Sequence, residues 1–125
     1  MRHREDDEQK ALMDWARVTR QRGILVADFL IAIPNGGKRN VKEAARLKAQ
    51  GVKAGVSDLF LAMPANGFCG MWIELKAPKT ATAAAGKPTQ AQLDWLSGMA
   101  QVGYAARLCY GWTAAKDSIL EYLAT

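Results

Sequence analysis

Hydrophobic positions follow two different periods along this chain, and the two periods predict helices and strands in mixed order. From Glu5 to Arg22 the apolar residues recur every three or four positions, which predicts a helix that ends at Gly23. The apolar run ILVADFLIAIP contains the first predicted strand, at its Leu30–Ile33 end, and the turn residues PNGG follow it. A short basic helix is then predicted from Val41 to Gln50. We expect its inner stripe to consist of Val41, Ala44 and Ala45, with Lys48 beside them.

The second half of the chain adds a hairpin, a helix, a strand and a closing helix. The runs Ser57–Met63 and Met71–Ala77 flank the turn-rich segment ANGFCG and are predicted to pair as adjacent strands. The segment PKTATAAAGKP has no period and is predicted to be a surface loop. A helix that begins at Thr89, a strand from Tyr104 to Tyr110 and a helix from Thr113 to Leu123 complete the chain. This order predicts a mixed α/β fold, with the hairpin central and helices on both faces of the sheet.

Length and composition exclude several classes of protein. A chain of 125 residues suits a single domain, residues 1–125, and its apolar fraction of 50% argues against disorder. No apolar stretch reaches the roughly 18 residues of a membrane span, and the charged start is unlike a signal peptide. We therefore expect a cytoplasmic protein that does not bind membranes. His3 is the single histidine, and Cys69 and Cys109 lack metal-ligand spacing, which argues against zinc sites and His-dependent triads.

Positive charge is concentrated in one part of the chain. The net charge is +5, and the stretch from residue 38 to residue 53 alone carries six basic residues against one acidic residue, Glu43. Clustered positive charge is typical of proteins that bind a phosphate backbone. A solvated helix face is the alternative, although such a face usually interleaves more acidic residues. The pattern favours nucleic acid as a partner.

The candidate chemistry lies on the predicted hairpin. The strand period places Glu74 and Lys76 on one face, and pairing of the two strands would bring Asp58 to the same side. Carboxylate oxygens suit Mg²⁺ or Mn²⁺, and a metal ion beside a cation is what phosphate-ester hydrolysis requires. The alternative is an ordinary exposed strand face with mixed charges.

Two polar residues on the predicted helices each allow two interpretations. Glu8 shares a stripe with Leu12 and Trp15, so it is either a buried carboxylate that needs a partner or metal, or a first-turn acid that favours the helix dipole. Gln92 fits a capping box with Thr89, or it could bind a water or phosphate from the start of its helix.

The turn Asn35–Arg39, NGGKR, does not fit a phosphate-binding P-loop, because the required first glycine and the Ser/Thr are absent. A glycine turn followed by two cations can still approach a nucleic-acid backbone closely. A plain turn explains the same residues equally well.

Taken together, these residues resemble the VRR-NUC domain of the PD-(D/E)xK nuclease superfamily. The resemblance runs from Glu8 to about Tyr122 and rests on IPNGGKR, EAARLKAQGVKAGVSDLF, WIELKAPK, QLDWL and CYGW. Ser57 stands where the superfamily name places proline before the aspartate. The resemblance implies an αβββαβ core, with a mixed central sheet flanked by helices, and a phosphodiesterase that depends on Mg²⁺ or Mn²⁺.

The resemblance also implies roles for individual residues. Asp58 and Glu74 would bind the metal together with the backbone carbonyl of Leu75. Lys76 would position the attacking water or help to deprotonate it, and would offset negative charge in the transition state.

Further roles follow from the same resemblance. Glu8 would support the metal site through water or a second ion, and Gln92 would orient the water or a phosphate. We expect the DNA contacts to come from polar and basic residues on either side of the site: Asn35, Lys38, Arg39, Lys42, Arg46, Lys53 and Lys79.

The function expected on these grounds is that of a structure-selective DNA endonuclease, of phage or prophage origin, acting as a homodimer on branched DNA such as a Holliday junction. In a viral setting the protein would work in the host cytoplasm. One alternative is a flap, duplex or restriction-type repair nuclease with the same site. Another is a non-catalytic DNA-binding or anti-nuclease module that retains the fold.

Overall fold

The computed structural model describes residues 3–34 and 40–124. Its elements are, in chain order, α1 (His3–Ala16), β1 (Arg20–Gln21), β2 (Ile24–Leu25), the 3-10 helix η1 (Val26–Asp28), β3 (Leu30–Ala32), α2 (Val41–Ala49), β4 (Leu59–Leu61), β5 (Met71–Lys76), α3 (Gln90–Gln101), β6 (Ala105–Tyr110) and α4 (Trp112–Leu123). No helix in the described residues is long and apolar enough to cross a membrane.

The main sheet has four strands in the order β3-β4-β5-β6. The strands β3, β4 and β5 pair antiparallel, whereas β5 and β6 run parallel and are connected through α3. The predicted central hairpin is confirmed, with Leu59 opposite Ile73. In this register Asp58, one position before β4, comes opposite Glu74, so the two side chains project from the same face.

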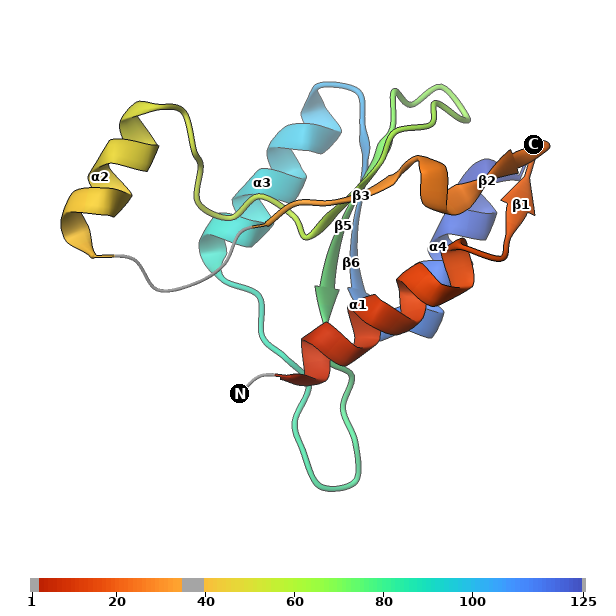
Figure 1. The fold of residues 1–125 in the computed structure, drawn as a ribbon, viewed down its shortest axis with the longest axis horizontal. Helices are drawn as coiled ribbons and strands as arrows, with labels where there is room; N and C mark the ends of the chain where they lie inside the picture. Colours follow the sequence, from red (N-terminus) through yellow and green to blue (C-terminus); the bar gives the residue numbers. More distant parts are fainter. Residues whose placement is uncertain (1–2, 35–39, 125) are drawn as a thin grey trace.

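The two faces of the sheet are covered differently. The helices α1 and α4 contact each other and lie on one side, while α3 lies on the other side (Figure 1). The first face carries the main core, which includes Leu12 of α1, Ile73 and Leu75 of β5 and Ile119 of α4, all nearly inaccessible to solvent. The α3 face carries aromatic side chains instead, with contacts among Phe60, Trp72, Trp95 and Tyr104. Glu74 and Lys76 follow Trp72 at strand spacing, so they belong to this second face.

The first helix ends earlier than its periodicity predicts. It stops at Ala16, and the next residues form the short hairpin β1–β2. Gly23 and Arg22 have positive φ values of 74° and 56° and form the turn of this hairpin, so Gly23 does not cap the helix. The guanidinium of Arg22 donates to the carbonyls of Leu123 and Pro64, which holds the hairpin against distant parts of the chain.

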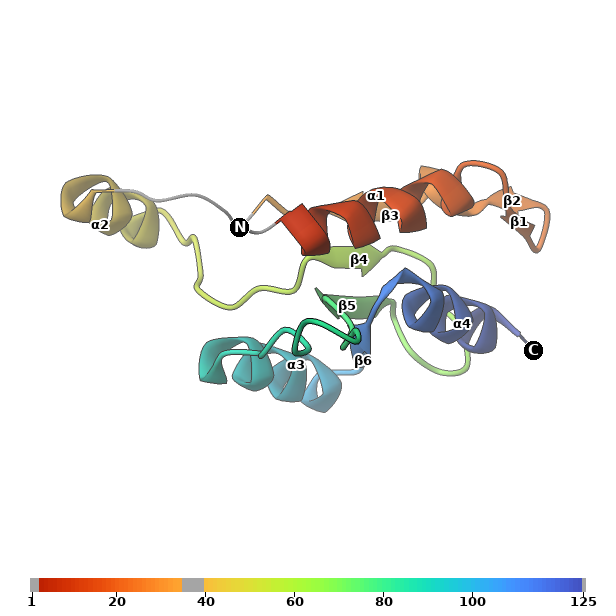
Figure 2. The same ribbon diagram turned by 90° about the horizontal axis from the view of Figure 1, so that it is seen from below.

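The helix α2 is where predicted, but its predicted inner stripe is wrong. None of its residues is buried, and Val41 is 88% exposed. Figures 1 and 2 show α2 standing away from the sheet and the other helices. The helix is defined locally, because the Asn40 side chain accepts from the backbone N–H of Glu43 at 2.7 Å. We call residues 40–54, which comprise α2 and its return segment, the α2 arm.

Candidate active site

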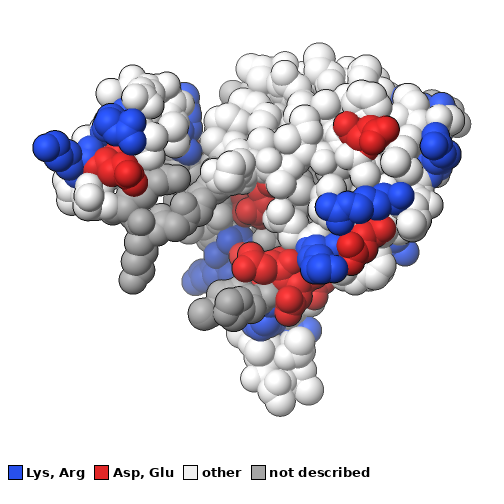
Figure 3. Space-filling model, viewed as in Figure 1, with Lys and Arg blue, Asp and Glu red and all other residues white. Residues whose placement is uncertain are grey.

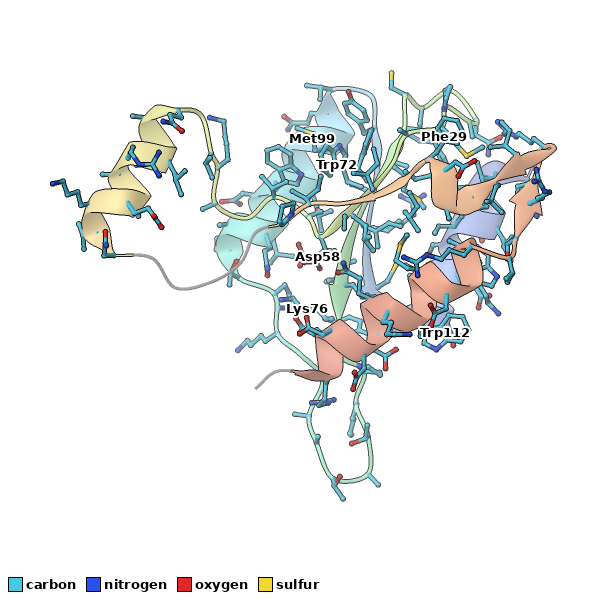
Figure 4. The ribbon with its side chains drawn as sticks, in the orientation of Figure 1. Phe29, Asp58, Trp72, Lys76, Met99 and Trp112 are labelled. Atoms are coloured by element: carbon cyan, nitrogen blue, oxygen red, sulfur yellow. The ribbon has the colours of Figure 1, made fainter. Side chains whose placement is uncertain are left out.

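Asp58 is fixed by its neighbours on both sides. The backbone N–H of Leu75 donates to Asp58 Oδ2 at 2.8 Å, and the N–H of Ile33 donates to the Asp58 carbonyl, also at 2.8 Å. The backbone pairing of β4 with β5 ends at Leu59 and Ile73. Beyond it, the N–H of Leu75 bonds to the side chain of Asp58 instead of to a backbone carbonyl. One of its carboxylate oxygens is oriented by the backbone, and the side chain remains half-buried. Figure 4 shows Asp58 and Lys76 in the same region, between α3 and the start of α1.

Glu74 is a buried carboxyl group with few hydrogen bonds to offset the loss of its hydration. It is 1% exposed, and among the described residues its Oε1 has no hydrogen-bond partner. Burial, together with the hydrogen bond and charge of Asp58, raises the pKa of Glu74 to about 9, although the Lys76 ammonium opposes this shift. Lys76 Nζ lies 3.9 Å from Glu74 Oε2 and is itself buried. The predicted Asp58, Glu74 and Lys76 group is therefore brought together.

The carbonyl of Leu75 faces the same side as Asp58. The N–H of Gly111 donates to the Lys76 carbonyl, so the backbone groups of Lys76 point toward β6. Backbone direction alternates along a strand, so the N–H and C=O of Leu75 point the other way, as its bond to Asp58 requires.

Two carboxylates and a carbonyl are oxygen ligands that suit Mg²⁺ or Mn²⁺. A cation between them would also relieve the unpartnered oxygen of Glu74. Within the described residues no group of three or more His, Cys, Asp or Glu side chains is placed to hold a metal ion, and the candidate donors here are two carboxylates and one backbone oxygen.

Glu8 faces inward, as its stripe predicts, but its partner is a helix end. Its Oε1 accepts from the backbone N–H of Trp112 at 2.8 Å, at the first residue of α4. The carboxylate thus satisfies an orphan donor and meets the positive end of the α4 dipole. No hydrogen bond joins it to Asp58 or Glu74 in the described part of the chain.

Glu5 is a further carboxylate near the candidate site, and the sequence analysis did not single it out. A Cβ at Gly86 would lie 2.7 Å from Glu5 Oε2 and 3.4 Å from the Cβ of Lys76, so the Glu5 carboxylate lies near the base of the Lys76 side chain. Its negative charge also contributes to the raised pKa of Glu74. Its position three residues before Glu8, on the same helix face, was the available signal.

Gln92 forms the predicted capping box with Thr89. The Thr89 N–H donates to Gln92 Oε1 at 2.8 Å, and the Gln92 N–H donates to Thr89 Oγ1 at 3.2 Å. The capping interpretation is therefore confirmed. Gln92 also lines a cavity together with Asp58, so the start of α3 lies next to the carboxylates.

This cavity, of about 750 Å³, separates the α2 arm from the start of α3. Among the predicted DNA-binding residues Lys53 lines it, whereas Lys42 and Arg46 are exposed on α2 and Lys79 is exposed after β5. Figure 3 shows basic side chains over the α2 arm and acidic side chains gathered over the N-terminal half of α1. Asn35, Lys38 and Arg39 lie outside the described residues.

A hairpin-centred mixed sheet between helices, with Asp58, Glu74 and Lys76 where the central strands β4 and β5 meet, defines an α/β protein with the predicted nuclease-type core. The family model of the VRR-NUC domain matches residues 1–112, and the chain belongs to this family. A solved structure described as a VRR_NUC domain protein is similar, with a TM-score of 0.79 and 28% sequence identity over 95% of this chain and 87% of that chain. None of the curated proteins compared with the chain matches it. Family membership implies a nuclease-type function on DNA, and the predicted family and fold class are confirmed.

Proposed function

We propose that this protein is a Mg²⁺- or Mn²⁺-dependent, structure-selective DNA endonuclease that cuts branched DNA such as a Holliday junction. The observation that carries the proposal is the burial of Glu74 beside Asp58, with one carboxylate oxygen unpartnered among the described residues. Burying a carboxyl group in this state is costly for a protein that only has to fold. Perturbed acidic pairs of this kind are typical of catalytic sites.

In the proposed site Asp58, Glu74 and the Leu75 carbonyl hold the metal ion. The bound ion supplies Lewis acidity to the phosphate and a water of lowered pKa. Asp58 is oriented for this role by the Leu75 N–H. To serve as a metal ligand Glu74 would have to give up the proton that its burial holds on it, because a ligand carboxylate is ionised.

Lys76 has the position needed to act on the attacking water. Its ammonium lies 3.9 Å from Glu74 Oε2 and is largely shielded from solvent, so its charge acts strongly on nearby anions. From there it would hold the water and offset the charge that develops on the phosphate. Gln92 and Glu8 act as positioning residues, through the start of α3 and the start of α4.

The DNA would approach over the α2 arm, where Lys42, Arg46 and Lys53 provide phosphate contacts. Lys79 would add a contact on the other side of the site. A homodimer is proposed because residues 3–34 and 40–124 hold one such site, while a junction must be cut on two strands. A cytoplasmic setting, in the host cell if the protein comes from a phage, completes the proposal.

The decisive experiment is a cleavage panel of four-way junction, flap, splayed arm and linear duplex, with Mg²⁺, Mn²⁺ or chelator. We expect the junction to be cut fastest, and only with metal. Glu74→Gln should slow cleavage by at least about 100-fold, whereas Glu121→Gln, the same change at an exposed position of α4, should not. Undiminished cleavage by the Glu74→Gln protein, purified free of other nucleases, would reject the assignment.

The same panel separates the proposal from a flap or duplex nuclease, which would cut those substrates faster than the junction. Calorimetric titration with Mn²⁺ separates it from a non-catalytic DNA-binding module. We expect the wild type to bind the ion and Asp58→Ala to lose that binding, because Asp58 is a proposed ligand. Failure of the wild type to bind Mn²⁺ or Mg²⁺ would favour the non-catalytic module.

A further inference from the structure

The cavity between the α2 arm and α3 combines aliphatic side chains and lysines, and the proposed metal site uses neither of them. Apolar and polar groups both line it. The apolar side chains come from the arm, from the start of α3 and from residues just outside the arm: Pro34, Ala44, Leu47, Val52, Ala54, Val56 and Ala91. Lys48, Lys53, Asp58 and Gln92 line the cavity as well. Val52 is 48% exposed, so this apolar surface is open to solvent.

We propose that this cavity binds one unpaired nucleotide of the DNA, next to the phosphate that is cut. The inference rests on the proposed nuclease function and specifies which feature of the DNA the enzyme selects. It assigns the base to the apolar walls and the adjoining phosphates to Lys48 and Lys53.

Backbone packing keeps the cavity in a defined shape. Gly55 has a φ of 82°, and a Cβ there would lie 2.4 Å from the backbone C and O of Ala91. The chain at Gly55, directly after the arm, therefore approaches the first turn of α3 too closely for a side chain to fit at this position. This contact sets the arm and α3 as two facing walls, with Thr89 and Gln92 on the α3 side.

The chemistry of the walls matches a nucleotide. A base has broad apolar faces, which aliphatic side chains can cover, and the attached phosphates attract ammonium groups. The volume of about 750 Å³ falls within the range of pockets that enclose a small organic ligand. A nucleotide that is to fill a cavity of this volume would first have to leave the stack of the duplex.

The position of Asp58 connects this pocket to the reaction. Asp58 lines the cavity and also lies in the carboxylate pair, so a nucleotide held here is continuous with the phosphate at the site. In paired duplex the base must first be unstacked and unpaired, which costs free energy. In a bulge or flap that cost is already met, and at a four-way junction it is lowered because base stacking is interrupted at the crossover. The pocket therefore favours DNA with an unpaired nucleotide at the cut.

The test compares the affinity for two labelled duplexes that differ by one unpaired nucleotide, using fluorescence anisotropy with Ca²⁺ in place of the catalytic ion. We expect the wild type to bind the bulged duplex about tenfold more tightly than the paired one. Ala44→Trp should fill the cavity and bring this ratio close to one. Ala45→Trp places the same bulk on the same exposed helix but outside the cavity, and should keep the ratio.

If Ala44→Trp does not fold by circular dichroism, Ala54→Trp, on the return segment, fills the cavity from another direction. The proposed pocket is wrong if the wild type binds the bulged and paired duplexes with nearly equal affinity. It is also wrong if a correctly folded cavity-filling variant keeps the tenfold preference for the bulged duplex. Cleavage with Mn²⁺ is scored separately. Metal-dependent cleavage with no preference for the bulged duplex would reject the pocket but support the nuclease. A preference for the bulged duplex with no cleavage would support the pocket but reject the nuclease.

Discussion

Replacing Glu74 with glutamine should stabilise the metal-free protein, and the gain should grow as the pH rises. Glu74 has a pKa of about 9 in the folded chain, against 4.5 for an ordinary glutamate. Between these values the folded state holds a proton that the unfolded state has lost, so wild-type stability falls as the pH increases. Glutamine has a similar shape but carries no ionisable group, so the stability of the variant should not fall with pH through this position.

The size of the effect follows from the width of the interval. Each pH unit between the two pKa values lowers the free energy of unfolding by about 1.4 kcal/mol through this one group. From about pH 5 to about pH 8 the variant should therefore gain roughly 4 kcal/mol relative to the wild type. This is a large part of the total stability expected for a domain of this size.

The assay is urea unfolding followed by circular dichroism in chelator, at several pH values from about 5 to about 8. Glu121→Gln is the matched control, since Glu121 is exposed and its difference from the wild type should stay flat with pH. A flat difference for Glu74→Gln as well would show that burial does not hold Glu74 protonated. The electrostatic account of the site would then fail.

Two further predictions concern groups near the site. Glu8→Ala should lower the free energy of unfolding by about 1 kcal/mol, because the Trp112 N–H at the start of α4 loses its acceptor. Glu8→Gln keeps an acceptor oxygen and should lose less stability than Glu8→Ala, as measured by thermal melts. A thermal midpoint for Glu8→Ala equal to that of the wild type would mean that the bond contributes nothing. Ser57→Ala should be neutral or stabilising, because Ser57 is 0% exposed and its Oγ has no partner among the described residues. A loss above about 1 kcal/mol in urea unfolding would instead reveal a partner for that hydroxyl.

Those parts of the fold that depend on local chemistry could be predicted from the sequence. The hairpin followed from two β-rich runs around a turn, and its register brought Asp58 opposite Glu74. The capping box of Thr89 and Gln92 followed from a spacing of three residues. Both features depend on groups that are near neighbours in sequence or in strand register.

Features that depend on distant partners were missed or left open. The partner of Glu8 is the backbone of Trp112, which lies 104 residues away. The end of α1 depends on a hairpin held by the contacts of Arg22 to Leu123 and Pro64. Periodicity in α2 indicated a face at Val41, but a period does not tell whether anything packs against that face.

The α2 arm has a consequence for how this protein can change. Since none of the α2 side chains is buried, substitutions there remove no core contact, and surface changes of this kind alter stability little. The carboxylates are held by the sheet and do not depend on α2 for their position. If the α2 arm contacts DNA as proposed, substitutions in it would change the DNA contacts while the sheet and the carboxylates stay in place.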